Sequence, residues 1–194
     1  MTTNNDGIMV ILSSPSGAGK TTLTKKIQQK YQNIKISVSH TTRKPRSNEV
    51  EGIDYFFVSH EEFKKKILNN EFYEHAKIFD NFYGTSKNSV NILLKKKNDI
   101  LFDVDWQGTQ QLNKFKELKL IKIFLVPPNK QELEKRLVQR NQDIPEVITK
   151  RLKAYEDDIF HWSDYDHVII NDSLEYCFIQ IEKIITEAKI YKKL

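Results

Sequence analysis

The chain has 194 residues, of which 39% are hydrophobic and 29% are charged, and it carries a formal net charge of +5 with a pI near 9.1. This length suits one compact unit with one substantial core, and it excludes two independent large domains. No apolar run approaches the ~20 residues that a membrane helix needs, so we expect no membrane partner.

The N-terminal residues and the single cysteine indicate where the protein works. Residues 1–6 are polar and lack the charged and apolar regions of a signal peptide. Cys177 is the only cysteine, which rules out an internal disulfide, and its apolar neighbours favour a buried helix position over a reactive thiol. We therefore expect a reducing, cytoplasmic location.

Buried strands and helices alternate along most of the chain. Apolar runs predict buried strands over residues 8–12, 100–104, 121–126 and 168–170. Helical patterns are found over residues 20–31, 89–97, 107–115, 130–140, 145–159 and 174–191. This alternation is typical of an α/β fold with a parallel sheet and helices on both faces.

The pattern changes between residues 34 and 86, where short alternating stretches are interrupted by turn-prone segments. The stretches cover residues 34–39, 55–58 and 72–79. They predict a small antiparallel insertion.

The basic charge suits either nucleic acid or a pocket for two strongly anionic small ligands, and it does not choose between them. Lysine runs at residues 64–66 and 95–97 lie on predicted helices, where a solvated face is the better explanation. We assign these runs no site and expect no nucleic-acid partner.

Residues 14–21 read Ser-Pro-Ser-Gly-Ala-Gly-Lys-Thr and lie between a buried strand and a helix, as a phosphate-binding loop does. Gly17 and Gly19 let backbone N–H groups turn toward anionic oxygens. Lys20 can reach terminal phosphates, and the Thr21 hydroxyl can ligate Mg²⁺. Ser14 replaces the first glycine of the motif, which a serine tolerates if its φ stays negative. The alternative is that these eight residues match the motif by chance on a solvated turn. The preceding strand, the glycines, the Lys-Thr pair and the following helix all favour the phosphate-binding loop instead.

A second candidate anion site lies within the insertion. Arg43 and Arg46 stand three residues apart beside hydroxyl side chains, and their planar guanidinium groups match phosphate oxygens. Tyr55 and Tyr83 can add phenolic donors. The spacing alone leaves an exposed basic turn as an equal alternative.

Four stretches, taken in order, match the signature of one enzyme family. They are residues 14–21, residues 39–46 (Ser-His-Thr-Thr-Arg-Lys-Pro-Arg), residues 72–76 (Phe-Tyr-Glu-His-Ala) with 83–85 (Tyr-Gly-Thr), and residues 103–108 (Asp-Val-Asp-Trp-Gln-Gly). Through them the chain resembles guanylate kinases, which move a phosphoryl group from ATP to GMP. The second and third stretches are specific to this family among phosphate-loop kinases.

The resemblance implies a single domain over residues 1–194. Its phosphate-loop parallel sheet has helices on both faces, a small inserted mixed β subdomain for the acceptor nucleotide, and a helical lid. The core is expected at residues 8–38, 88–128 and 160–194, the GMP-binding insertion at 39–87 and the lid at about 129–159. The implied ATP-binding residues are Ser14, Pro15, Ser16, Gly17, Ala18, Gly19, Lys20, Thr21 and Thr22.

The resemblance also assigns the acceptor site. Ser39, Glu74, Thr85 and Asp105 match guanine-reading residues, and Arg43, Arg46, Tyr55 and Tyr83 match the clamp for the GMP phosphate. A carboxylate can accept hydrogen bonds from both N1–H and the N2 amino group of guanine, a donor pair that adenine lacks. The alternative for Glu74 is a surface acid at a strand edge, although Leu68, Phe72 and Ala76 suggest partial burial. We expect dGMP to be a weaker acceptor.

Further residues are implied for the metal and for catalysis. Asp103, at the end of a buried strand, is expected to hold Mg²⁺ with Thr21 through water; capping the next helix is its alternative role. Arg136, Arg140 and Arg151 match lid arginines, for which a salt bridge on a solvated helix is the alternative. The implied catalytic residues are Lys20, Arg43, Arg136, Arg140 and Arg151.

Two other functions are weighed against this one. A non-catalytic interaction module is expected to have a degraded phosphate loop, whereas Lys20 and Thr21 are intact here. A kinase for AMP or dTMP keeps the loop but is expected to lack the set Ser39, Glu74 and Asp105. The sequence makes no prediction about the oligomeric state.

Overall fold

A five-stranded sheet forms the centre of the computed structural model, which describes residues 7–139 and 144–191. All its strands are parallel, in the order β2-β7-β1-β8-β9. They are β1 (Met9–Ser13), β2 (Ile34–Ile36), β7 (Asp99–Asp103), β8 (Leu120–Val126) and β9 (His167–Ile170). The four predicted strands are confirmed with small shifts at their ends, and β2 is an additional edge strand.

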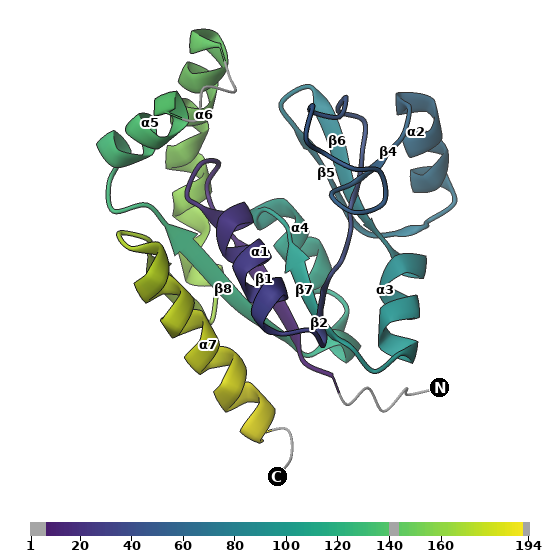
Figure 1. Ribbon diagram of the computed structural model, residues 1–194. Coiled ribbons are helices and arrows are strands. Elements are labelled where there is room, and N and C mark those ends of the chain that lie inside the picture. The colour runs from purple at the N-terminus through teal and green to yellow at the C-terminus, as the bar shows by residue number, and fades with distance from the viewer. Residues whose placement is uncertain (1–6, 140–143, 192–194) are drawn as a thin grey trace.

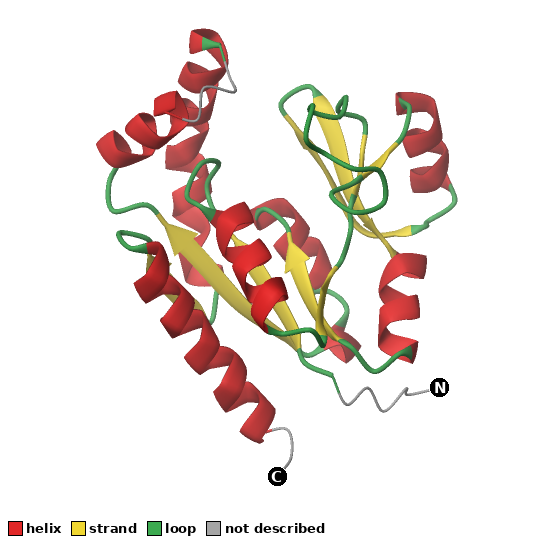
Figure 2. Cartoon of the chain, viewed as in Figure 1, coloured by secondary structure: helices red, strands yellow, loops and turns green. Residues whose placement is uncertain are grey.

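Helices cover both faces of this sheet, as the sequence predicts (Figure 2). On one face, Val10 and Leu12 of β1 join a core cluster with residues of α1 (Lys20–Lys30) and α7 (Leu174–Tyr191). On the other face, Met9 and Ile11 pack with residues of α3 (Lys87–Lys95) and α4 (Trp106–Leu112). Cys177 of α7 is buried in the first cluster, which confirms its predicted position.

Two helices differ from their predicted bounds, and a local contact explains the first difference. The Ser86 hydroxyl accepts a hydrogen bond from the Ser89 backbone N–H and caps α3, so this helix begins at Lys87 rather than at residue 89. The helix α4 ends at Leu112, and the short 3₁₀ helix η1 (Lys116–Leu118) follows.

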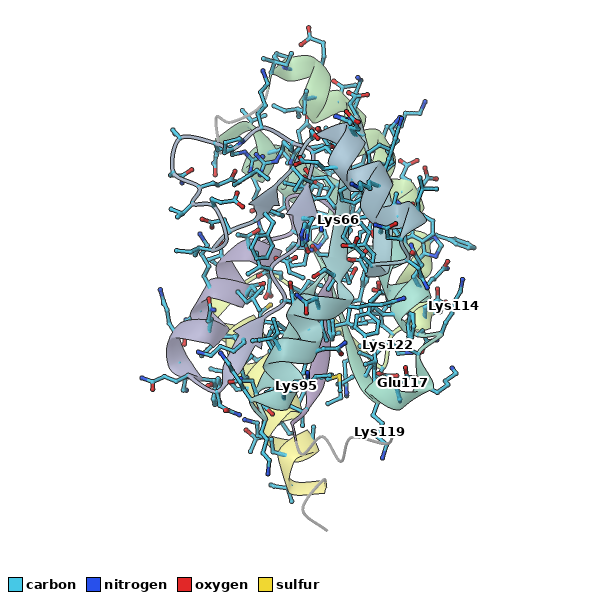
Figure 3. The ribbon with its side chains drawn as sticks, turned by 90° about the vertical axis from the view of Figure 1, so that its right-hand side faces the viewer. Lys66, Lys95, Lys114, Glu117, Lys119 and Lys122 are labelled. Atoms are coloured by element: carbon cyan, nitrogen blue, oxygen red, sulfur yellow. The ribbon has the colours of Figure 1, made fainter. Side chains whose placement is uncertain are left out.

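The two lysine runs lie on different helices. Figure 3 shows Lys66 on α2 (His60–Leu68) and Lys95 on α3, separated along one face of the molecule.

A second, four-stranded sheet has the order β4-β3-β6-β5. Its strands are β3 (His40–Thr41), β4 (Phe56–Phe57), β5 (Phe72–Ile78) and β6 (Asn81–Ser86). β6 pairs antiparallel with β5 and β3, but β3 and β4 are parallel, so the sheet is mixed. Phe63 of α2 stacks on Phe72 and Phe82 with ring centroids 4.7 and 5.5 Å apart, which attaches the helix to this sheet.

The mixed β subdomain that the resemblance implies is confirmed, whereas the antiparallel insertion inferred from the local pattern between residues 34 and 86 is wrong in two respects. Ile34–Ile36 pairs parallel with β7 in the main sheet, with Ile34 opposite Asp99. The bridge between His40 and Phe56 is also parallel. Strand pairing of this kind depends on partners far apart in the chain, which local alternation does not specify.

The remaining helices stand on the side of the molecule opposite the second sheet. α5 (Lys130–Gln139) and the start of α6 (Pro145–Phe160) lie beyond the carboxyl ends of the main strands (Figure 1), whereas Ile159 near the end of α6 packs against the core cluster that contains Met9 and Ile11. The 3₁₀ helix η2 (His161–Asp164) leads from α6 into β9. Within residues 7–139 and 144–191, no helix combines the length and the apolar character that crossing a membrane demands.

Candidate active site

The loop between β1 and α1 has the backbone of a phosphate-binding loop. Gly17 and Gly19 have φ values of +94° and +99°, in the left-handed region that favours glycine. A Cβ on Gly17 would come within 2.7 Å of Leu137 Cδ2, so α5 packs directly against the loop. Ser14 lies outside the left-handed region, as its replacement of glycine requires, and its hydroxyl donates to the Pro15 carbonyl at 2.9 Å.

Asn171, which directly follows β9, contacts the phosphate-binding loop and holds it in place by a hydrogen bond. Its Nδ2 donates to the Ala18 carbonyl at 2.6 Å, and its backbone N–H donates to Val126 O at 2.7 Å. The residue is 1% exposed, and a Cβ on Gly19 would collide with its Nδ2. We did not predict a role for Asn171. The available signal was a polar residue directly after a buried strand, at the edge where the phosphate loop also lies.

Lys20 and Asp103 meet at the ends of two neighbouring strands. The Lys20 ammonium donates to Asp103 Oδ1, and also to the Val104 carbonyl at 3.2 Å. β1 and β7 are in register with Leu12 opposite Asp103, which brings the carboxylate beside the start of α1. Asp103 does not cap the next helix. Asp105 does so, because its Oδ1 accepts from the Gly108 backbone N–H at 3.0 Å.

Glu74 lies buried in the second sheet with the other predicted guanine-reading residues around it. It is 4% exposed and pairs with Thr85 across β5 and β6. The Thr85 hydroxyl lies 3.5 Å from Ser39 Oγ. Phe72 and Ala76 are buried as expected, but Leu68 is 85% exposed, so its use as a sign of burial was wrong.

Burial away from solvent is the largest influence on the pKa of Glu74. Burial raises the pKa of Glu74 to about 7, and the nearby Asp105 carboxylate acts in the same direction. Hydrogen bonding with Thr85 and the charge of Lys20 favour the ionised form and limit the rise in pKa. The carboxyl group is therefore poised to change protonation near neutral pH.

The predicted phosphate clamp is assembled around Arg43. Its guanidinium Cζ lies 5.4 Å from the Tyr55 ring centroid, and the Tyr55 and Tyr83 rings are 5.9 Å apart. The Arg43 side chain is 17% exposed and the Arg46 side chain 34% exposed, and both contact Glu49. An exposed basic turn does not describe this arrangement. Burial raises the pKa of the Tyr55 phenol, and the charge of Asp103 acts in the same direction.

The predicted lid arginines have different surroundings. Arg151 of α6 donates from Nη1 to Ser16 Oγ at 2.9 Å, so this arginine reaches the phosphate-binding loop. Arg136 of α5 pairs instead with Glu132, one helical turn earlier, at 3.1 Å. For Arg136, the structure therefore contains the helix salt bridge that was its alternative role. Arg140 lies outside the described residues.

The fold and the loop define a class: an α/β protein with a phosphate-binding loop after the central strand β1 of a parallel sheet. Residues 7–188 match the family model described as guanylate kinase. The chain is 42% identical over 192 residues to a guanylate kinase of Paramagnetospirillum magneticum, covering 99% of this chain and 90% of that protein. A guanylate kinase of Rickettsia bellii is 44% identical over 187 residues, with 96% and 97% covered. The chain belongs to the guanylate kinase family and is a phosphotransferase enzyme.

Solved structures agree with this membership. The crystal structure of guanylate kinase from Anaplasma phagocytophilum matches with a TM-score of 0.78 and 35% identity, covering 94% of this chain and 86% of that one. The SH3-kinase fragment of tight junction protein 3 matches with a TM-score of 0.55, covering 97% of this chain and 60% of that one. Its identity is 11%, so this second similarity concerns the fold alone.

Proposed function

We propose that this enzyme transfers the γ-phosphoryl group of ATP to GMP, giving ADP and GDP. The observation that carries the proposal is the buried carboxyl group of Glu74, 4% exposed and surrounded by polar side chains, in the sheet that flanks the phosphate-binding loop. A buried carboxylate needs hydrogen-bond donors, and guanine offers N1–H and its N2 amino group side by side. Adenine lacks this donor pair, so AMP leaves the carboxylate unpaired.

The clamp residues Arg43, Arg46, Tyr55 and Tyr83 bind the GMP phosphate in this proposal. An oxygen of that phosphate attacks the γ-phosphorus of ATP, a new P–O bond forms, and the bond to the β,γ-bridging oxygen breaks to release ADP. The attacking oxygen is already anionic, so the reaction needs no general base. Catalysis consists of aligning two anions and neutralising their charge.

The cations that neutralise this charge come from both sides of the transferred group. Lys20 lies at the start of α1, where the helix dipole also favours anions. Arg151 already contacts the phosphate-binding loop through Ser16. Arg136 and Arg140 complete the set if the lid, residues 129–159, closes over the two nucleotides. Closure also excludes water, a competing acceptor for the phosphoryl group.

Mg²⁺ is the expected cofactor, and the residues at the loop fit it. The hydroxyl of exposed Thr21, at the start of α1, and the partly exposed Asp103 carboxylate would hold the ion, with water completing its shell. Among the described residues there is no cluster of three or more potential His, Cys, Asp or Glu ligands, as suits an ion that keeps several waters. When bound, Mg²⁺ supplies charge neutralisation at the phosphates of ATP.

The domain division and the location belong to the same proposal. Residues 39–87 receive the acceptor nucleotide, and dGMP is a weaker acceptor than GMP. A cytoplasmic location fits a chain whose single cysteine, Cys177, is a buried thiol.

The deciding experiment measures ADP release from ATP and Mg²⁺ with GMP, dGMP, AMP or dTMP as the acceptor. GMP is expected to be preferred over AMP by about 10⁴ or more in kcat/KM, because AMP leaves Glu74 unpaired. A preference for AMP or dTMP would mean that the acceptor site binds a nucleotide other than GMP. Absence of turnover with every acceptor would indicate a non-catalytic module.

A further inference from the structure

The side-chain amide of Gln111 binds the edge of the second sheet. β5 is an outer strand of that sheet, and its residue His75 directs both backbone polar groups away from β6, as alternate residues of an antiparallel strand do. Gln111 Nε2 donates to the His75 carbonyl at 2.7 Å, and Gln111 Oε1 accepts from the His75 backbone N–H at 3.1 Å. The amide therefore takes the place that the peptide group of a further strand would occupy.

Gln111 comes from a helix that is fixed to the main sheet. Leu112, the next residue of α4, is fully buried in the core cluster with Met9 and Ile11 of β1. Gln111 Nε2 also donates to the Gln107 carbonyl, one helical turn earlier, at 3.3 Å. The side chain is thus held by its own helix while its amide binds β5. This contact joins the two sheets in one relative position.

The contact lies beside the proposed guanine pocket. His75 directly follows Glu74 in β5, and Gly108, one turn before Gln111 in α4, packs against the Glu74 carboxyl group. Residues three apart lie on the same face of a helix. The face of α4 that carries Gly108 and Gln111 therefore contacts two successive residues of β5. Gln111 fixes the backbone at this point, and the Glu74 side chain extends from the neighbouring residue.

The chemistry of the contact demands an amide. A glutamine side chain offers an acceptor and a donor in one plane, and the backbone of His75 requires both. A carboxylate of the same size only accepts, so it would place its charge against the His75 carbonyl. A methionine has a similar length but has no N–H or O–H to donate. Packing alone would accept any of the three side chains.

We propose that Gln111 is a positioning residue that sets base specificity: it holds β5 against α4 so that the Glu74 carboxylate meets both N1–H and the N2 amino group of guanine. This inference rests on the proposed function, because it takes Glu74 as the guanine-reading residue. Two hydrogen bonds to one rigid base edge require both carboxylate oxygens in place, and a loosened β5 weakens them together. Gln111 itself need not touch the nucleotide.

The test compares GMP with inosine monophosphate (IMP), which keeps N1–H, O6 and the phosphate but lacks the N2 amino group. The wild-type enzyme should prefer GMP over IMP by about tenfold or more in kcat/KM, as expected for one hydrogen bond to a carboxylate. In Gln111→Met this ratio should fall by about threefold or more, through a higher KM for GMP. The KM for ATP should change by less than about twofold, because the phosphate-binding loop is untouched.

Gln111→Glu is the second variant, and it should lower the GMP/IMP ratio at least as much, because the carboxylate cannot donate to the His75 carbonyl. Gln110→Glu makes the same chemical change at the adjacent, exposed residue of α4 and should keep the wild-type ratio. General damage to the subdomain would weaken GMP and IMP alike and leave their ratio unchanged. An unchanged ratio in both Gln111 variants, even with lower thermal stability, overturns the proposal.

Amide hydrogen exchange measures the contact without catalysis. The His75 amide should exchange slowly in the wild-type protein, although it lies on an edge strand, and faster in Gln111→Met. Equal exchange in the two proteins would mean that Gln111 does not hold β5, which also overturns the proposal.

The wild-type enzyme separates this inference from the proposed function. If it uses GMP and IMP equally well, Glu74 does not read the N2 amino group, and the proposed pocket fails together with the role of Gln111. If it prefers GMP and both Gln111 variants keep the full preference, the pocket stands and Gln111 has no part in specificity.

Discussion

Gly108 of α4 packs directly against the carboxyl group of Glu74. A Cβ at Gly108 would lie 2.8 Å from Glu74 Oε2 and 3.2 Å from its Cδ. The absence of a side chain at Gly108 therefore sets how deeply the carboxyl group sits, and α4 acts as the back wall of the proposed guanine pocket.

Gly108→Ala is expected to separate stability from substrate affinity. Alanine is favoured over glycine inside a helix by about 1 kcal/mol, which offsets part of the crowding against Val104 and Glu74. The displaced carboxyl group should nevertheless raise the KM for GMP by about tenfold or more, with the KM for ATP unchanged. Steady-state kinetics and thermal unfolding test this. Gln110→Ala on the exposed side of α4 is the matched control, and equal kinetics in the two variants would contradict the prediction.

The affinity for GMP should depend on pH through Glu74. With a pKa of about 7 in the free enzyme, Glu74 is mostly protonated at pH 6 and mostly ionised at pH 8. Only the ionised form accepts both guanine donors, so the KM for GMP should fall as the pH rises through 7. Because the GMP phosphate also titrates near pH ~6, the profile must be compared with that of Glu74→Gln. This variant should bind GMP more weakly and lose the Glu74 part of the pH dependence; an unchanged profile and affinity would remove Glu74 from the pocket.

The same pKa predicts the opposite trend for stability. The ordinary pKa of a glutamate side chain is 4.5 and that of Glu74 in the folded protein is about 7, so the folded state binds more protons between these pH values. The contribution of Glu74 to the free energy of unfolding is therefore complete below pH 4.5 and is lost as the pH rises through 7. Urea unfolding of the wild type and of Glu74→Gln at several pH values measures the difference. A difference that grows from pH 5 to pH 8 in favour of the wild type would contradict the sign.

Lys20→Ala should reduce kcat by about 100-fold or more, because a cation aimed at the transferred charge is lost. The substitution also leaves the Asp103 carboxylate without its ammonium partner. The assay is ADP release at saturating ATP and GMP. Lys183→Ala, at a lysine whose side chain is 76% exposed on α7, is the control and should keep full activity. Comparable loss in both variants would point to damage of the fold.

Asn171→Ala tests whether the loop needs its anchor. Removing the amide leaves the buried Ala18 carbonyl without this donor and opens space beneath Gly19. We expect a loss of about 1–3 kcal/mol in the free energy of unfolding and a higher KM for ATP, with the KM for GMP little changed. Chemical denaturation and kinetics with each nucleotide varied in turn give the three values. A rise confined to the KM for GMP would be evidence against this role.

The sequence was informative where a short segment carries its own physical requirement. The glycines at positions 17 and 19, followed by Lys20, indicate a phosphate-binding loop, because this loop needs the left-handed backbone conformation that glycine favours. The buried strands were equally clear, since both faces of a parallel sheet are apolar. In the phosphate-binding loop and the buried strands, the local sequence is therefore sufficient to predict the local structure.

Contacts between distant segments were harder to anticipate. The pairing of Asn171 with Ala18 and the fit of Gly108 against Glu74 join segments that meet only in the folded chain. Leu68 looked like a core residue because it is apolar and near Phe72, but it lies at the exposed end of α2. The contacts of Glu49 with Arg43 and Arg46 were overlooked because an acid beside a basic motif has no distinctive spacing, and they depend on the turn at residues 46–49.

Asp103 sits where it touches Lys20 and influences the ionisation of Tyr55. A nucleotide that binds at the phosphate-binding loop or at the clamp therefore changes the electrostatic field around Asp103, which lies near both. Thermodynamic linkage then requires reciprocity: whatever factor ATP imposes on the dissociation constant of GMP, GMP imposes on that of ATP. Any synergy or antagonism between the two substrates therefore has the same magnitude whichever of them binds first.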